Sequence, residues 1–280
     1  MTVTLAGLTL ASPVLVAAGC GGTGRELAAY GDLHRLGGFV TRSITLDARP
    51  GGAMPRIVET PGGLVNAIGF HNPGLEQFLA IELPWLVRQG ARVVVSIAGS
   101  TMGEYADLAR RLGSAPGVSA LEVNLSAPDA TGPHVFDIRE PFQAGGVVSA
   151  VRRDLPRGIP VLAKLRTDVF RVVETARTVV EAGADAVVIG NALPAALPDG
   201  RAGGLSGPAI RPLALRCLAD THAALPEVPL IASGGVATVA DVRAFLAAGA
   251  VAVQVGTALL HDPTTAHRLV TELGLEGDAP

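Results

Sequence analysis

Eight short apolar runs, spread along the 280-residue chain, constrain its fold more than any other feature. They are rich in Val, Ile and Ala and show little polar alternation, which is typical of parallel strands buried on both faces. The runs are Val14–Ala18, Gly38–Thr41, Val93–Ile97, Ala120–Asn124, Val161–Leu165, Ala186–Ile189, Leu230–Ala232 and Val251–Val255.

Helical patterns separate most of these runs, so the chain repeats a strand–helix unit. The predicted helices include Gly103–Leu112, Ala144–Arg153, Arg171–Ala182, Ile210–Ala224 and Val239–Ala248. Gly183 and Gly249 each stand in an Ala-Gly-Ala segment and are predicted to follow the C-terminus of a helix. Eight such units predict an α/β fold, a single (β/α)₈ TIM barrel over residues 1–280. A short N-terminal β-hairpin is expected before the first barrel strand.

An open doubly wound sheet is the alternative fold. It would place a Gly-x-Gly-x-x-Gly loop after the first strand, and Gly19-Cys-Gly-Gly-Thr-Gly24 has the wrong spacing for that motif. The Pro- and Gly-rich segments Arg49–Pro55 and Leu193–Ser206 are interpreted as long loops after barrel strands. Neither predicts a domain boundary.

Composition excludes several classes of function. A net charge of −3 gives no basic surface for nucleic acid, and no apolar run reaches the ~20 residues of a membrane span. Cys20 and Cys217 are far apart, so neither a disulfide framework nor a metal site is expected. Two cysteines without such a framework favour a cytoplasmic protein.

Glycine-rich segments follow the last two predicted strands. In a TIM barrel the functional loops follow the C-terminal ends of the strands, and a phosphate often binds after the seventh and eighth. Ser233-Gly234-Gly235 and Gly256-Thr257 occupy those places. Their backbone N–H groups predict a phosphate site, although each segment alone could be an ordinary turn.

Polar side chains end other apolar runs. Lys164 closes the fifth run, and it either points into the barrel mouth or extends to solvent at the rim. Asn124 closes the fourth run, Asn191 follows the sixth, and Asn66 and Asn72 lie in a Gly-rich segment after the second. Amides offer both donors and acceptors, so several at one mouth predict a flat heterocyclic ligand.

Several short motifs are spread nearly end to end along the chain. They are Thr41-Arg-Ser-Ile-Thr45, Pro55-Arg56, Asn66-Ala-Ile-Gly69, Asn72-Pro-Gly74, Asn124-Leu-Ser126, Lys164-Leu165, Gly203-Gly-Leu-Ser-Gly207, Ser233-Gly-Gly235 and Val253-Gln-Val-Gly-Thr257. Together they make the chain resemble the dihydroorotate dehydrogenase family, with the soluble class 1 enzymes as the nearest group. The resemblance implies FMN as the cofactor, a hydride transferred from a small cyclic substrate, and a base on the loop after the fourth strand.

The same resemblance implies roles for individual residues. The implied FMN-binding residues are Ala18, Gly19, Arg42, Ser43, Asn124, Lys164, Gly207, Ser233, Gly234, Gly235, Gly256 and Thr257. The implied substrate-binding residues are Arg42, Asn66, Ile68, Gly69, Phe70, Asn124, Asp129, Asn191 and Ala192. The implied catalytic residues are Arg42, Lys164 and Asp129.

Four positions of the substrate site depart from the family pattern. Ala127 stands where the family has its Cys or Ser base, and Asp129 stands where it has Asn. Arg42 replaces a lysine, and Ala192 replaces a hydroxyl residue. Since alanine cannot accept a proton and a carboxylate would repel an acidic substrate, we expect a changed, pyrimidine-like substrate.

Two alternatives to a changed substrate remain. Ordinary dihydroorotate dehydrogenase activity is one, and a non-catalytic flavin-binding barrel that serves as an assembly partner is another. His71 and His134 are weaker candidates for an acid or base in place of Ala127. The resemblance also implies a homodimer, or pairing with an iron–sulfur electron-transfer flavoprotein, because this chain has no cysteine cluster of its own.

Overall fold

Eight parallel strands close into a barrel in the computed structural model, which describes residues 2–126, 138 and 140–277. Around the barrel the order is β10-β13-β14-β3-β4-β7-β8-β9. The barrel strands are β3 (Val14–Val16), β4 (Gly38–Val40), β7 (Val93–Ile97), β8 (Val118–Asn124), β9 (Val161–Leu165), β10 (Ala186–Ile189), β13 (Leu230–Ser233) and β14 (Ala250–Val255). Each corresponds to a predicted apolar run, so the TIM-barrel prediction is confirmed.

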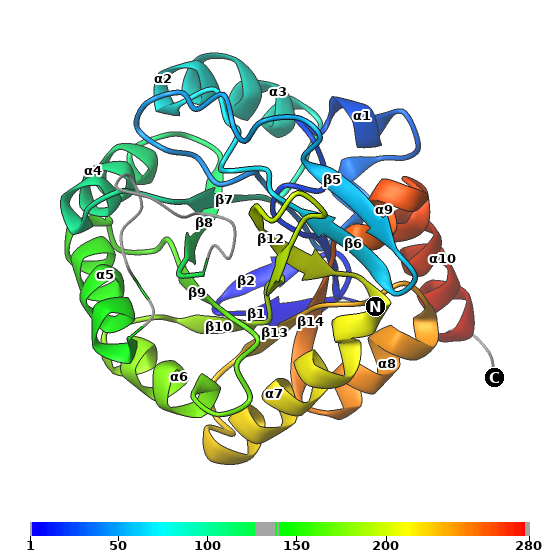
Figure 1. The fold of residues 1–280 in the computed structure, drawn as a ribbon. Helices are drawn as coiled ribbons and strands as arrows, with labels where there is room; N and C mark the ends of the chain where they lie inside the picture. The colour runs from blue at the N-terminus through cyan, green and yellow to red at the C-terminus, as the bar shows by residue number, and fades with distance from the viewer. Residues whose placement is uncertain (1, 127–137, 139, 278–280) are drawn as a thin grey trace.

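Helices surround the barrel (Figure 1). They are α1 (Arg25–Ala28), α2 (Leu75–Gln77), α3 (Leu83–Arg88), α4 (Met102–Gly113), α5 (Pro141–Asp154), α6 (Val172–Glu181), α7 (Arg211–Ala224), α8 (Val239–Ala247), α9 (Thr257–His261) and α10 (Thr265–Gly277), with a π-helical turn at Phe78–Glu82 and 3-10 turns at Leu33–Arg35 and Pro208–Ile210. Gly183 and Gly249 follow α6 and α8 with φ of 105° and 106°, as the Ala-Gly-Ala segments predict. No described helix is long and apolar enough to cross a membrane.

Helix α5 begins three residues before the predicted start at Ala144. Pro141 occupies its first turn, where a missing N–H costs nothing. The backbone N–H of Glu140 donates to the side chain of Gln143 at 3.2 Å. The start was missed because it depends on capping contacts and not on apolar periodicity.

The N-terminal hairpin of β1 (Val3–Leu5) and β2 (Leu8–Leu10) closes one end of the barrel. Leu5 and Leu10 are about 1% exposed and pack against a layer of inward-facing strand residues. That layer comprises Leu15, Val40, Val94, Ala120, Leu162, Ala186, Val188, Ile231 and Ala252. Since side chains alternate along a strand, the residues two positions further on form the next interior layer, toward the open mouth.

A four-stranded antiparallel sheet lies over that mouth (Figure 1). Its strands are β5 (Ile57–Thr60), β6 (Gly63–Asn66), β11 (Leu193–Ala196) and β12 (Ala202–Ser206), in the order β11-β12-β6-β5. The interpretation of Leu193–Ser206 as a loop was therefore wrong. Its glycines and prolines resembled turn signals, but β12 pairs with β6, more than a hundred residues earlier, and local sequence does not reveal such pairing.

Candidate functional site

A cavity of about 400 Å³ opens at the C-terminal end of the barrel strands, within the ~300–1,000 Å³ range usual for ligand sites. Nearly every predicted site residue that the structure describes lines it. The set is Ala18, Gly19, Arg42, Ser43, Asn66, Ile68, Phe70, Asn124, Lys164, Asn191, Ala192, Gly207, Ser233, Gly234, Gly235, Gly256 and Thr257. Gly69 lies between two lining residues but is not itself part of the wall. Ala127, Asp129 and His134 lie outside the described residues.

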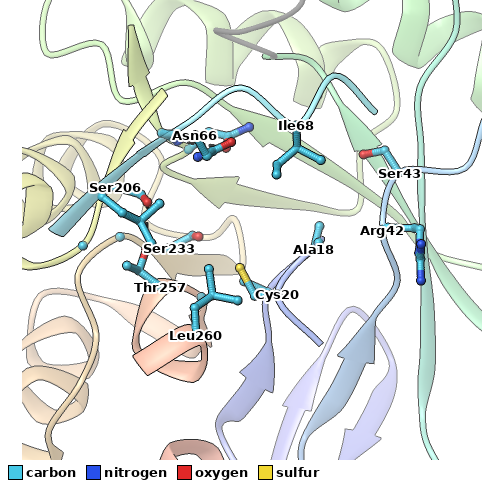
Figure 2. Close-up of a pocket in the computed structure, with 18 of the residues that line it drawn as sticks. Ala18, Cys20, Arg42, Ser43, Asn66, Ile68, Ser206, Ser233, Thr257 and Leu260 are labelled. Carbon is cyan, nitrogen blue, oxygen red and sulfur yellow. Dashed lines mark hydrogen bonds between the residues drawn. The ribbon is translucent and has the colours of Figure 1, made fainter. Parts of the chain in front are cut away.

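One side of the cavity carries hydroxyl groups and glycines. The Thr257 hydroxyl donates to Ser206 Oγ at 2.8 Å, and Ser233 lies beside them (Figure 2). Gly207 and Gly235 have φ of 105° and 74°, a region that side chains disfavour. The two glycine loops therefore meet, as their positions after β13 and β14 predict.

The opposite side carries a network of amides and hydroxyls. The Asn124 amide donates to Ser43 Oγ at 3.0 Å, and Ser43 Oγ lies 3.0 Å from Ser96 Oγ. The Asn191 amide donates to the carbonyl and hydroxyl of Ser126 at 2.6 and 2.9 Å. The expectation that several asparagines converge on one mouth is met for Asn66, Asn124 and Asn191, which line the cavity, and not for Asn72.

Gly190 shows why β10 ends where it does. A Cβ at this position would lie 1.8 Å from the carbonyl oxygen of Ser233, and φ is 111°. Only glycine allows the ends of β10 and β13 to approach this closely. The close approach brings Asn191 and Ser233 onto the same cavity wall.

The loop after β6 contains a strained residue, and hydrogen bonds from a buried side chain hold it in place. Phe70 has φ of 56°, which is unusual for a bulky residue. Buried Asn72 supports it: its amide donates to the Phe70 carbonyl at 2.6 Å, and its side-chain oxygen accepts from the Gly74 N–H at 2.9 Å. The Arg49 guanidinium lies over the Phe70 ring at 5.9 Å. Asn72 thus stabilises the conformation of this loop without lining the cavity itself.

Lys164 lies in the barrel interior, is 4% exposed and lines the cavity, which agrees with the interpretation that it points into the barrel mouth and excludes the alternative of a rim lysine. Its Nζ donates to Gln254 Oε1 at 2.7 Å and lies 3.4 Å from Glu122 Oε1. Glu122 and Gln254 were missed in the sequence. A signal was present, because each interrupts an apolar strand with a polar residue two positions beyond an inward-facing one.

Arg42 places a cation in the cavity wall. Its guanidinium lies 4.0 Å from the Glu82 carboxylate, and its buried Nε has no hydrogen-bond partner among the described residues. Burial raises the pKa of Glu82, and Arg42 opposes that rise. The pairing is loose, so Arg42 retains donors for an anionic ligand.

Two further titratable groups line the cavity. Burial lowers the pKa of His71, and the cations Arg56 and Arg42 lower it further, so the imidazole is neutral at neutral pH. Burial raises the pKa of Cys20 to about 11, which Lys164 partly opposes. Cys20 is therefore a neutral thiol, and both Cys20 and Cys217 are free.

A closed barrel with a polar cavity and glycine loops at the C-terminal end of its strands defines the nucleotide- or phosphate-binding TIM-barrel class. The sequence matches the family model for dihydroorotate dehydrogenase over residues 1–276. It is 44% identical over 278 residues to dihydroorotate dehydrogenase B (NAD(+)), catalytic subunit, of Pelobacter propionicus, covering 96% of this chain and 90% of that protein. The same subunit of Desulforudis audaxviator is 44% identical over 280 residues, covering 97% and 90%.

Solved structures agree in fold. A dihydroorotate dehydrogenase of Eimeria tenella, in complex with ferulenol, superposes with a TM-score of 0.82 at 22% identity, covering 97% of this chain and 83% of that one. The chain belongs to the dihydroorotate dehydrogenase family, flavin-dependent oxidoreductases that act on a CH–CH bond with FMN as cofactor.

The residues of the cavity fit FMN. Hydroxyls and glycines suit a phosphate at one side, and the Lys164 ammonium and amide donors suit a flavin ring's carbonyls. A Cβ on Gly19 would meet no protein atom within 4 Å, so this wall leaves room for a ligand. Arg42 supplies a buried donor without a protein partner among the described residues.

Proposed function

We propose that the chain oxidises dihydroorotate to orotate with FMN, as the catalytic subunit of an enzyme whose final acceptor is NAD⁺. The observation that carries this proposal is the joint placement of Lys164, Asn124 and Asn191 in one cavity at the C-terminal end of the barrel. The two relatives at 44% identity, each the catalytic subunit of a dihydroorotate dehydrogenase B (NAD(+)), support the substrate and the acceptor. They favour dihydroorotate over the changed substrate that the loop after β8 suggested.

The hydroxyl side of the cavity would hold the FMN phosphate. Ser206, Ser233 and Thr257 offer donors, and the loops at Gly234-Gly235 and Gly256 let the backbone approach. Lys164 would lie against the flavin ring where negative charge develops on reduction. When bound, FMN supplies the acceptor for the hydride that leaves the substrate.

The amide side would hold the substrate. Asn66, Asn124 and Asn191 present donors and acceptors that suit the imide and carbonyl groups of a dihydropyrimidine. Arg42 would pair with the substrate carboxylate through guanidinium donors that Glu82, at 4.0 Å, leaves available. The strained loop at Phe70 would fix the backbone of the same wall.

Proton removal is the step for which this chain departs from its family. Oxidation of the CH–CH bond sends one hydrogen to FMN as a hydride and releases its neighbour as a proton. Ala127 cannot take that proton. Among the described residues of the wall, neutral His71 is the candidate base, because its lowered pKa leaves it unprotonated at neutral pH.

A second candidate function is the same oxidation on a different cyclic substrate. Ala127 and Asp129 favour it, since the first removes the family's base and the second places a carboxylate where the family has an amide. A non-catalytic flavin barrel is the third interpretation, and any flavin reduction by a substrate would exclude it.

The test is anaerobic mixing of FMN-loaded protein with dihydroorotate while the flavin absorbance is followed. Bleaching in a single phase that saturates with dihydroorotate is the expected result. Retention of the oxidised spectrum over many minutes, with bleaching by another dihydropyrimidine, would reject the proposal in favour of the second candidate. Adding NAD⁺ and a purified electron-transfer subunit then tests the proposed acceptor, and sedimentation of the chain alone tests the proposed homodimer.

A further inference from the structure

Three polar side chains form a layer inside the barrel, between the hairpin and the cavity. Glu122, Lys164 and Gln254 each stand two residues beyond an inward-facing apolar residue of β8, β9 and β14. Their side chains therefore point to the barrel axis. They are 0%, 4% and 1% exposed.

Gln254 bridges the other two. Its Oε1 accepts from Lys164 Nζ at 2.7 Å, and its Nε2 donates to Glu122 Oε2 at 2.5 Å. Glu122 Oε1 lies 3.4 Å from Lys164 Nζ and has no hydrogen-bond partner among the described residues. The ammonium is thus held by one carboxylate and one amide oxygen from strands on different sides of the barrel.

Stability alone does not account for this layer. Burying an ion pair costs desolvation that its attraction seldom exceeds, and apolar residues of similar volume usually stabilise a core as well or better. The layer directly below is apolar, so apolar side chains do fit this interior.

Only one member of the layer reaches the cavity. Lys164 lines it, whereas Glu122 and Gln254 do not. Cys20 also interacts electrostatically with Lys164, and it is a neutral thiol because burial raises its pKa to about 11. Of the three residues, Lys164 is therefore the one placed to contact a bound flavin.

We propose that Glu122 and Gln254 are positioning residues that hold Lys164 as a cation at the floor of the cavity. In this way they set the ratio of the affinities for reduced and oxidised FMN. The inference rests on FMN binding and not on the identity of the substrate. A fixed positive charge beside the ring favours the reduced, anionic flavin over the neutral oxidised one.

The variant that tests this is Glu122→Gln, which keeps the shape and removes the counter-charge. A buried ammonium without a counter-charge loses its proton or moves toward water. Either change removes positive charge from the floor of the cavity. We expect the ratio of affinities for reduced and oxidised FMN to fall at least tenfold, toward the value for Lys164→Met. Tenfold corresponds to about 30 mV in a two-electron potential.

The readout is the flavin midpoint potential and the FMN dissociation constant, measured without substrate. Asp185→Asn is the matched control, because it breaks an ion pair with Arg152 beside the start of β9, at the other end of the barrel. It should leave the ratio unchanged. An unchanged or increased ratio in Glu122→Gln would overturn the proposal, and an unchanged ratio in Gln254→Leu would remove Gln254 from it.

A double-mutant cycle covers the case in which Glu122→Gln alone folds poorly. Adding Glu122→Gln to Lys164→Met should change the ratio by less than about twofold, because Glu122 acts through the lysine. A further tenfold change in that background would show that Glu122 acts independently and would overturn the proposal. Since no substrate is present, failure of the dihydroorotate proposal would leave these results unaffected.

Discussion

The side-chain amide of Asn124 donates to the hydroxyl of Ser43 at 3.0 Å, which joins the end of β8 to the segment after β4 across the cavity wall. The side-chain oxygen of Asn124 also accepts from the N–H of Ser126 at 3.2 Å. Hydrogen bonds at both the nitrogen and the oxygen of its side-chain amide thus fix the orientation of Asn124.

Asn124→Ala should slow flavin reduction by at least ~10²-fold, because it removes a preorganised amide from the reacting wall. Rapid mixing with dihydroorotate measures the rate. Ser114→Ala, an exposed change on α4's C-terminal side, is the control and should react at the wild-type rate. A wild-type rate in Asn124→Ala would place this amide outside the reacting wall.

Thr257→Ala and Ser206→Ala should each weaken FMN binding by roughly 10- to 100-fold, since hydrogen bonds to charged groups contribute about 1.5–3 kcal/mol. Equilibrium titration of apoprotein with FMN gives the affinity. Thr264→Ala removes a surface hydroxyl that bonds to Asp262 and should bind FMN normally. Equal affinities in all three variants would locate the phosphate elsewhere.

His71→Gln should slow flavin reduction by dihydroorotate by ~10²–10⁴-fold, the usual contribution of a positioned base, because His71 is the proposed base. Ala127→Cys combined with Asp129→Asn should restore much of the rate in the His71→Gln background, since it supplies a base at the position where the family has one. Flavin bleaching measures both. An unchanged rate in His71→Gln would mean that another group takes the proton.

Cys20 should react with iodoacetamide at pH 8 roughly 10²-fold more slowly than a small free thiol. Burial raises its pKa to about 11, so little thiolate is present at pH 8, and the rate should rise about tenfold per pH unit below that value. Mass spectrometry of a Cys217→Ala variant isolates the Cys20 signal. Rapid labelling at pH 8 would contradict the raised pKa of this thiol.

Asn72→Ala should lower the free energy of unfolding by about 1–3 kcal/mol, because the carbonyl of Phe70 and the N–H of Gly74 lose their partner. Chemical denaturation of the apoprotein measures the change. Thr271→Ala, which removes a hydroxyl that donates to the His267 carbonyl in the preceding turn of α10, is expected to change stability by less than about 1 kcal/mol.

The sequence by itself determined the barrel, because its strands bury both faces and appear as separate apolar runs with capping glycines such as Gly183 and Gly249. It also placed Lys164 and Asn124 at the site, since the carboxyl ends of parallel strands share one edge. Both inferences need only local pattern.

Tertiary structure decided what depends on distant partners. The pairing of β12 with β6 changed a predicted loop into a sheet over the mouth, and the depth of Lys164 in the barrel decided between the two positions that the sequence left open for it. The partnership of Glu122 with Gln254 joins residues 132 positions apart. Local pattern can single out each polar residue within its apolar strand, but it does not identify the partner, because closure of the barrel creates the contact.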